Sequence, residues 1–264
     1  MSVHSLKIDA NPIRNAHTLG VITHATLWNY PFENYPVLSE LFSSITTFEV
    51  DAHWGMLVSN DEYAVLAFRG TDSNLEWAQS FTYKQVPWIA GNAHAGFIQA
   101  LDLLWENVMA ALYDAHIVDE EKTLWVTGHS LGGALALLSA DRLVHAGIRV
   151  QEVQTFGTPQ VFDPVAAKAF PVPVRRFINN EDPIPQTSWP TLFDTYAHVG
   201  EEYFLLASGA LAKNRHSRDL ARKIDRAYSI GEGILPAGMI HDHFMKEYLK
   251  KIRTLDEQES PTPS

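Results

Sequence analysis

The chain between residues 46 and 70 alternates apolar and polar residues with the period of a β-strand. The segment TTFEVDAHWGMLVSNDEYAVLAFRG breaks this pattern at Ser59-Asn60-Asp61, three residues that favour a turn. The run Tyr63–Phe68 that follows is apolar throughout. This pattern predicts a hairpin whose second strand is buried.

Helical spacing comes next, in the segment GFIQALDLLWENVMAALYDAH. Its apolar residues recur three or four positions apart and form one stripe, as expected of a helix that packs on a sheet. The stripe consists of Phe97, Leu101, Leu104, Val108 and Leu112.

Strand and helix patterns then alternate along the rest of the chain. Such alternation favours parallel pairing of the strands, with helices on both faces of the sheet. We therefore predict an α/β protein with a mostly parallel central sheet. The expected strands are Thr123–Thr127, Glu152–Phe156, Val174–Asn179 and Ala197–Leu206, with a helix over Leu131–His145.

Length and composition fit one globular domain. The 264 residues are 46% hydrophobic and 19% charged, and they contain no apolar run long enough to span a bilayer. The closing DEQESPTPS offers nothing to bury and predicts a disordered tail over about residues 256–264. We expect a single domain over residues 1–264.

Charge and cysteine content exclude several kinds of partner. A net charge of −11 argues against nucleic acid, whose phosphates need clustered Lys and Arg. The lack of cysteine excludes disulfides, thiolate metal sites and a cysteine nucleophile. The N-terminal segment lacks the apolar core of a signal peptide, which favours a cytoplasmic protein or one secreted without a recognisable signal.

The element GHSLG, residues 128–132, places Ser130 between the predicted strand and the predicted helix. A strand-to-helix turn this tight leaves no room for side chains two positions before and after the serine, which explains the glycines. The amide of Leu131 at the helix start points toward any oxygen bound beside the serine. The alternative is that Ser130 only caps the helix. In this context we expect Ser130 to be a nucleophile.

A serine nucleophile needs a base, and the base needs an orienting acid. Asp182 ends a predicted strand in FINNEDPIP, and Pro183 prevents the strand from continuing. Open parallel sheets place their sites at the carboxyl ends of strands, so Asp182 is the expected acid. Glu181 is the neighbouring competitor, and Asp163 and Asp194 are weaker candidates.

Two histidines, His241 and His243, stand just before a final helix in MIHDHFMKEYLKKI. The residues alone leave the choice of base between them open. His129 is too close to the serine along the backbone to act as its base; we expect it to pack against the sheet, and we group it with the substrate-side residues. A metal at His241-Asp242-His243 lacks a third ligand, so we expect no metal.

Several segments resemble the class 3 lipase family, the fungal-type triacylglycerol lipases of the α/β-hydrolase superfamily. The resemblance spans roughly Val65–Leu249 and includes VLAFRGTDSNLEW, NAHAGFIQAL, VTGHSLGGALALL, QTFGTPQVFD, FINNEDPIPQ and HFMKEYL. In the family the catalytic base stands five residues before a tyrosine, and the spacing of His243 and Tyr248 therefore selects His243. The resemblance implies an α/β-hydrolase fold and a catalytic triad with Ser130 and Asp182, without a cofactor. The chain departs from the fungal members in lacking cysteines.

The resemblance also implies two features beside the serine. Thr71 supplies a second oxyanion donor together with Leu131. The segment 72–91 forms a lid that covers the serine in water and moves aside at a lipid surface. Its large apolar residues fit this role, because an exposed apolar patch is usually a binding surface. The alternative is that these residues fill a core. The expected lid and substrate residues are Leu75, Trp77, Phe81 and Trp88.

We therefore expect a serine carboxylic-ester hydrolase, specifically a lipase that acts on acylglycerols through an acyl-enzyme. Phospholipase A1 and feruloyl or short-chain esterase activities are alternatives within this chemistry, and a non-catalytic hydrolase-like binding protein is the alternative outside it. The expected partners are a lipid or ester substrate and, transiently, a lipid–water interface. A predicted helical stripe of Arg215, Arg218, Arg222 and Arg226 is either a solvated face or a contact for anionic headgroups.

Overall fold

The computed structural model describes residues 3–8, 11–28, 35–70, 84–119, 122–186, 195–212, 219 and 241–259. The predicted arginine stripe lies outside these ranges, as do Thr71, Leu75, Trp77 and Phe81. Within the described ranges, no helix is long and apolar enough to cross a membrane.

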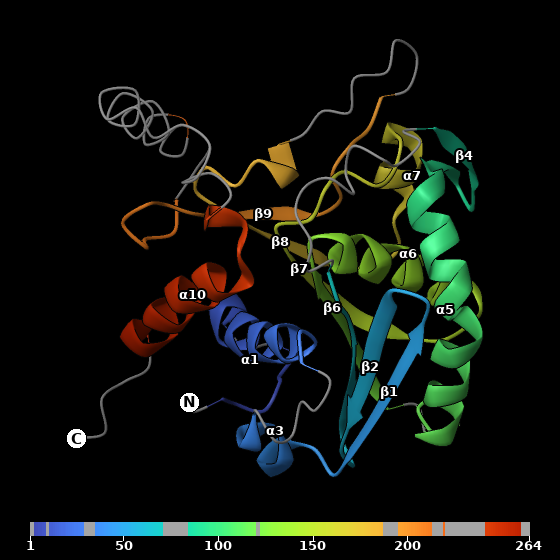
Figure 1. Ribbon diagram of the computed structural model, residues 1–264, viewed down its shortest axis with the longest axis horizontal. Helices are drawn as coiled ribbons and strands as arrows, with labels where there is room; N and C mark the ends of the chain where they lie inside the picture. The colour runs from blue at the N-terminus through green and yellow to red at the C-terminus, as the bar shows by residue number, and fades with distance from the viewer. Residues whose placement is uncertain are drawn as a thin grey trace.

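The central sheet (Figure 1) consists of β1 Ser44–Val50, β2 His53–Ser59, β3 Tyr63–Phe68, β6 Thr123–His129, β7 Val150–Phe156, β8 Val174–Asn179 and β9 Glu201–Leu205. The strands lie in the order β1-β2-β3-β6-β7-β8-β9. β1, β2 and β3 pair antiparallel, whereas β3 and the strands that follow it pair parallel. The sheet is therefore mostly parallel, as predicted.

β6 lies in the middle of the sheet and leads to the predicted nucleophile. Its residues from Leu124 to Gly128 are buried, because β3 and β7 flank the strand and helices cover both faces. In the strand register, Phe68 of β3 is opposite Gly128, and His129 is opposite Phe156 of β7. The carboxyl ends of these three strands therefore lie side by side next to Ser130.

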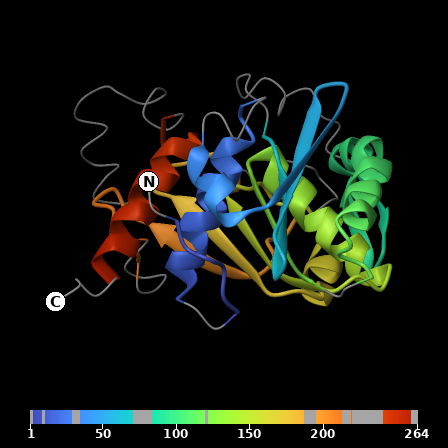
Figure 2. The ribbon, with the colours of Figure 1, turned by 90° about the horizontal axis from the view of Figure 1, so that it is seen from below.

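Helices cover both faces of the sheet (Figures 1 and 2), with α5 Ala95–Asp114 and α6 Leu131–His145 on one face and α1 Pro12–Ala25 and α10 Met245–Glu259 on the other. Each face has its own apolar core, one including Phe97 and Leu135 and the other Leu19 and Tyr248. Figure 2 shows α1 and α10 side by side, with α5 across the sheet from them. The short helices are α3 Pro36–Leu41, α7 Pro164–Ala169 and the 3₁₀ turn Ile184–Gln186.

Three elements have the predicted bounds: Tyr63–Phe68, Leu131–His145 and Val174–Asn179. The strand predicted from Ala197 begins only at Glu201. The amide of Ala197 donates to the carbonyl oxygen of Phe162 at 2.8 Å, so this residue pairs outside β8.

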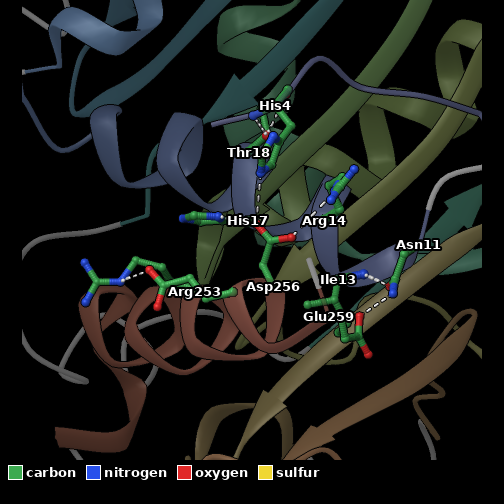
Figure 3. Close-up of polar contacts among 10 residues, drawn as sticks. His4, Asn11, Ile13, Arg14, His17, Thr18, Arg253, Asp256 and Glu259 are labelled. Atoms are coloured by element: carbon green, nitrogen blue, oxygen red, sulfur yellow. Dashed lines mark hydrogen bonds and ion pairs between the residues drawn. The ribbon is translucent and has the colours of Figure 1, made fainter. Parts of the chain in front are cut away.

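A buried polar cluster around Asp256 joins α1 to α10 (Figure 3). His17 Nδ1 lies 2.8 Å from Asp256 Oδ2, and His4 and Arg14 lie 3.5 Å and 3.7 Å from the same carboxylate. Asp256 is 4% exposed, and α10 continues beyond it to Glu259. The prediction of a disordered tail is therefore wrong for residues 256–259, because burial against α1 gives this polar end of the helix a partner, and residues 260–264 lie outside the described ranges.

A separate two-stranded ribbon, β4 Gln85–Trp88 and β5 Gly91–His94, precedes α5. Of the lid predicted over residues 72–91, residues 72–83 lie outside the described ranges, and residues 85–88 pair with residues 91–94. The amide of His94 donates to the carbonyl oxygen of Val161 at 3.0 Å, which ties the ribbon to the loop after β7.

Candidate active site

Ser130 occupies the tight turn between β6 and α6, with φ 56° and ψ −125°. Positive φ is strained for a residue with a side chain. The turn around Ser130 is possible because the residues two positions before and after it are glycines. A Cβ at Gly128 would lie 2.2 Å from the carbonyl oxygen of Gly132, and a Cβ at Gly132 would lie 2.2 Å from that of Phe68. Backbone contact therefore requires both glycines. Within the described residues, the Ser130 side chain makes no capping bond to α6, which argues against a mere capping role.

The two candidate bases have different surroundings. His243 Nε2 lies 2.9 Å from Ser130 Oγ, and only 17% of the His243 side chain is exposed. His241 points elsewhere: its Nε2 lies 3.3 Å from a Glu247 carboxylate oxygen, and its side chain is 54% exposed. The structure therefore brings His243 to the serine and leaves His241 at the surface.

Asp182 lies on the other side of the His243 ring. Nδ1 of His243 is 3.0 Å and 2.9 Å from the two carboxylate oxygens of Asp182, which is completely buried. The amide of Ile184 donates to Asp182 Oδ1 at 2.9 Å, because the chain turns into a 3₁₀ helix after the strand. Ser130, His243 and Asp182, far apart in the sequence, thus form one hydrogen-bonded line.

Two of the competing acids have described contacts with other groups, and the third lies outside the described residues. The amide of Glu181 donates to Asp242 Oδ2 at 3.2 Å. Asp163 caps α7 through the amide of Ala166 at 2.7 Å and also binds the ribbon. Asp194 lies outside the described residues.

Tyr248 of α10 completes the surroundings of Asp182. Its hydroxyl donates to Asp182 Oδ2, and burial, followed by the charge of Asp182, raises the pKa of Tyr248 well above its ordinary value. The phenol therefore stays protonated and remains a donor. Gly157, with φ 59°, leaves the space for this group: a Cβ there would lie 2.8 Å from Asp182 Oδ2 and 3.2 Å from His243 Nδ1.

Leu131 begins α6 directly after the serine. The amides of Gly133 and Ala134 donate to the carbonyl oxygen of Ser130 at 3.0 Å and 3.3 Å, which starts the intrahelical pattern. The Leu131 amide precedes that pattern, and such first-turn amides have no acceptor within their own helix. A Cβ at Gly70 would lie 3.4 Å from Ser130 Cβ, so the chain that leads into Thr71 passes directly beside the serine.

Residues 65–191 match the family model described as Lipase (class 3). The chain is 32% identical over 150 residues to a lipase of Rhizomucor miehei and 30% identical over 146 residues to the secreted mono- and diacylglycerol lipase A of Penicillium cyclopium. Over this region the chain is therefore similar to the class 3 lipase family. The family match includes Ser130 and Asp182, and His243 lies beyond it.

The class 3 lipase matches differ in extent between sequence and structure. Each of the two sequence matches covers 53% of this chain but only 41% and 47% of the respective relatives, less than half of their length. The solved triacylglyceride lipase of Rhizomucor miehei aligns with a TM-score of 0.62 at 24% identity, over 74% of this chain and 82% of that one. This likeness establishes the α/β-hydrolase fold of the chain.

Trp88 lies away from Ser130, contrary to its prediction as a lid or substrate residue. Its indole Nε1 donates to Asp141 Oδ2 at 2.6 Å, and the guanidinium of Arg142 lies 5.0 Å from the ring centroid. Both partners belong to the last turns of α6, about 15 Å along the helix from Leu131 at a rise of ~1.5 Å per residue. The ribbon β4–β5 holds Trp88 there.

His129 makes contacts that the sequence did not predict. Its Nε2 lies 2.6 Å from the backbone carbonyl oxygen of His243, and the two ring centroids are 4.6 Å apart. His129, grouped above with the substrate-side residues, contacts the loop of the candidate base.

Asp242 and Tyr248 are the site residues that the sequence did not reveal as such. Asp242 Oδ2 accepts from the Asn180 side chain at 3.0 Å, and its backbone oxygen accepts from Asn179 Nδ2 at 2.8 Å. These bonds tie the loop of His243 to the end of β8. Tyr248 was visible only as a spacing landmark, since nothing in a sequence links it to Asp182. Among the residues that the structure describes, no group of three His, Cys, Asp or Glu is arranged to hold a metal.

Proposed function

We propose that the protein is a serine hydrolase that cleaves the ester bonds of acylglycerols through an acyl-enzyme. One observation carries this proposal: the hydrogen-bonded line from Ser130 Oγ through the His243 ring to Asp182, with 2.9 Å between the atoms at each step. Such a line converts a weakly acidic hydroxyl into a nucleophile.

Ser130 Oγ attacks the ester carbonyl carbon while His243 Nε2 accepts the hydroxyl proton. The buried carboxylate of Asp182 stabilises the imidazolium that forms. His243 then donates this proton to the oxygen of the leaving alcohol, and the acyl group stays on Ser130. In the second half, His243 takes a proton from water, the resulting hydroxide equivalent attacks the acyl-enzyme, and the carboxylic acid leaves as the serine regains its proton.

The negative charge on the carbonyl oxygen needs aimed donors. We assign this role to the Leu131 amide and to Thr71, and each such donor contributes about 3 to 4 kcal/mol to transition-state stabilisation. The start of α6 at Leu131 supports the first assignment, and the approach of Gly70 to Ser130 supports the second.

Acylglycerols are the proposed substrates because two relatives carry names that say so: the Penicillium cyclopium protein is a mono- and diacylglycerol lipase, and the Rhizomucor miehei structure is a triacylglyceride lipase. The apolar residues Leu75, Trp77 and Phe81 are the part of the predicted lid that remains in this proposal. Large apolar side chains of this kind suit contact with a lipid–water interface.

A fluorophosphonate probe tests the chemistry directly. We expect stoichiometric labelling of the wild-type protein, no labelling of Ser130→Ala, and a fall in esterase rate of about 10⁴-fold or more in that variant. Mass spectrometry of the labelled peptide identifies the site. An unlabelled wild-type protein would instead support a non-catalytic binding protein.

The substrate class is tested with p-nitrophenyl esters of graded chain length, each assayed below and above its solubility limit. A rate that rises sharply above the limit supports a lipase with a moving lid. A preference for short esters in true solution, without such a rise, contradicts the lipase assignment and leaves a plain esterase.

A further inference from the structure

His129, the residue before Ser130, lies against the loop that carries His243. Its Nε2 is 2.6 Å from the backbone carbonyl oxygen of His243, and its ring lies 4.6 Å from the His243 ring at an interplanar angle of 34°. The Tyr248 ring meets it edge-on at 6.0 Å. A carbonyl oxygen only accepts, so Nε2 of His129 carries the proton and donates it.

We propose that His129 is a positioning residue that fixes the base relative to the nucleophile, an inference that rests on the proposed hydrolase function. His129 and Ser130 share a peptide bond. Two adjacent residues therefore each form a hydrogen bond with His243: His129 with its backbone carbonyl oxygen and Ser130 with its Nε2. A shift of the loop away from the serine stretches both bonds together.

Two further hydrogen bonds hold this loop on the side of the acid rather than on the side of the serine. Asn179 Nδ2 donates to the Asp242 carbonyl oxygen at 2.8 Å, and Asn180 Nδ2 donates to the Asp242 side chain at 3.0 Å. Asn179 ends β8, the strand that leads to Asp182, and Asn180 follows it directly. His129, at the end of β6, ties the same loop to the strand of the nucleophile. Catalytic rates fall steeply when reacting groups are misplaced by about 1 Å, so this second tie has a kinetic consequence.

A role of His129 as a second base does not fit its contacts. Nε2 is occupied by the carbonyl, and Nδ1 faces the backbone at Gly70, where a Cβ would lie 3.5 Å away. Burial and then the neighbouring His243, with a smaller effect from His24, lower the pKa of His129 well below its ordinary value. A neutral His129 ring does not repel the imidazolium that forms on His243 during the reaction.

The competing explanation is that the ring only fills space, and two variants separate the explanations. His129→Gln keeps a side-chain N–H donor but removes the ring, whereas His129→Phe keeps a ring but removes the donor. The readouts are kcat and KM on a soluble p-nitrophenyl ester, the fluorophosphonate labelling rate and the thermal unfolding temperature.

We expect His129→Phe to lose about 10- to 100-fold in kcat and in labelling rate, with KM changed by less than about twofold, and His129→Gln to retain more of both rates. Equal or higher activity of His129→Phe than of His129→Gln overturns the proposal, because space-filling then suffices. If His129→Phe does not fold, His129→Met, close to Gln in size but without a donor, takes its place under the same criterion.

His17→Phe is the matched control, since it also removes a buried histidine contact, 2.8 Å to Asp256, on the far part of α10. We expect it to lower the unfolding temperature and to leave kcat unchanged. A wild-type protein that neither reacts with the probe nor hydrolyses esters contradicts the proposed function itself. An active wild type with a fully active His129→Phe contradicts only the positioning role.

Discussion

His94 shows how burial fixes the protonation state of a single residue. It is fully buried at the end of β5, its Nδ1 accepts the amide of Phe97 at 3.4 Å as the cap of α5, and its ring stacks on Phe97 at 4.1 Å. Burial lowers the pKa of His94 to about 4. The cap is therefore a neutral imidazole, because a protonated Nδ1 could not accept the amide.

This residue makes stability depend on acid. Its pKa of about 4 in the folded protein lies below the ordinary histidine value of 6.5, so the unfolded chain binds the proton more readily. The contribution of the neutral His94 side chain to the free energy of unfolding is complete above pH 6.5. It is lost as the pH falls toward 4, by up to about 1.4 kcal/mol per pH unit. We expect His94→Asn, which retains a capping side chain, to lose less stability between pH 6.5 and pH 4.5 in urea titrations. Parallel pH dependence of the two proteins would contradict this account.

Two residues of the proposed triad were predictable from local signatures: glycines surround Ser130, and a strand ends before Asp182. The residues alone left His241 and His243 open as the base, and the family resemblance selected His243. The donor role of Tyr248 and the position of His129 were not predictable. Both depend on hydrogen bonds to residues far away in the sequence, and no local pattern encodes such a contact.

Among the elements, β3 and α6 were predicted with their observed bounds because their apolar residues are continuous or regularly spaced. α1 was not predicted. Asn15, His17 and Thr18 of this helix are buried along with its apolar residues, so it lacks the polar face that reveals an amphipathic helix. The position of Trp88 was missed for another reason. Its hydrogen-bond partner Asp141 lies in α6, far from Trp88 in the sequence, and no local pattern links the two residues.

The first turn of α6 depends on a glycine that helix propensity alone disfavours. A Cβ at Gly133 would lie 1.8 Å from Thr158 Oγ1 and 2.9 Å from Thr158 Cβ. Alanine is a better helix former than glycine by about 1 kcal/mol, but this overlap forces the helix start away from β7 at a cost of about 1 to 3 kcal/mol. We expect Gly133→Ala to lower both the free energy of unfolding and kcat, because Ser130 moves with the helix.

Gly147, at the opposite end of the same helix, is the control for this change. It has φ +84°, and a Cβ added there would meet no atom within 4 Å, so Gly147→Ala introduces backbone strain of about 1 kcal/mol without a clash. We expect full kcat in this variant. Adding Thr158→Ala to Gly133→Ala removes the nearest clashing atom and should restore part of the lost activity. Wild-type kcat in Gly133→Ala would contradict this account, because it would show that the turn accommodates the added Cβ without displacing Ser130.

At the scale of the whole molecule, the contact of α1 with α10 closes the face of the sheet behind the site. Leu249 and Met245 of α10 approach Gly20 of α1, where a Cβ would lie 3.3 Å and 3.4 Å from their side-chain atoms. The two helices therefore pack closely at a glycine, and the buried cluster around Asp256 joins them further along (Figure 3). The same α10 supplies Tyr248, so its attachment stabilises the segment that follows the candidate base.

Removal of the Asp256 carboxylate tests this attachment. Asp256 and His17 side chains are 5% and 3% exposed, and breaking a buried pair by removal of one partner costs about 3 to 5 kcal/mol. We expect Asp256→Ala to lose about that much stability in urea unfolding and Asp256→Asn, which keeps an oxygen acceptor for His17, to lose less. Glu257→Ala, at a side chain that is 69% exposed, should change stability by less than about 0.5 kcal/mol. Fluorophosphonate labelling of Asp256→Ala should persist under conditions in which the variant is folded, because the contacts of Asp256 described above lead to α1 and the N-terminal segment. Wild-type stability of Asp256→Ala would show that apolar packing alone holds the two helices together.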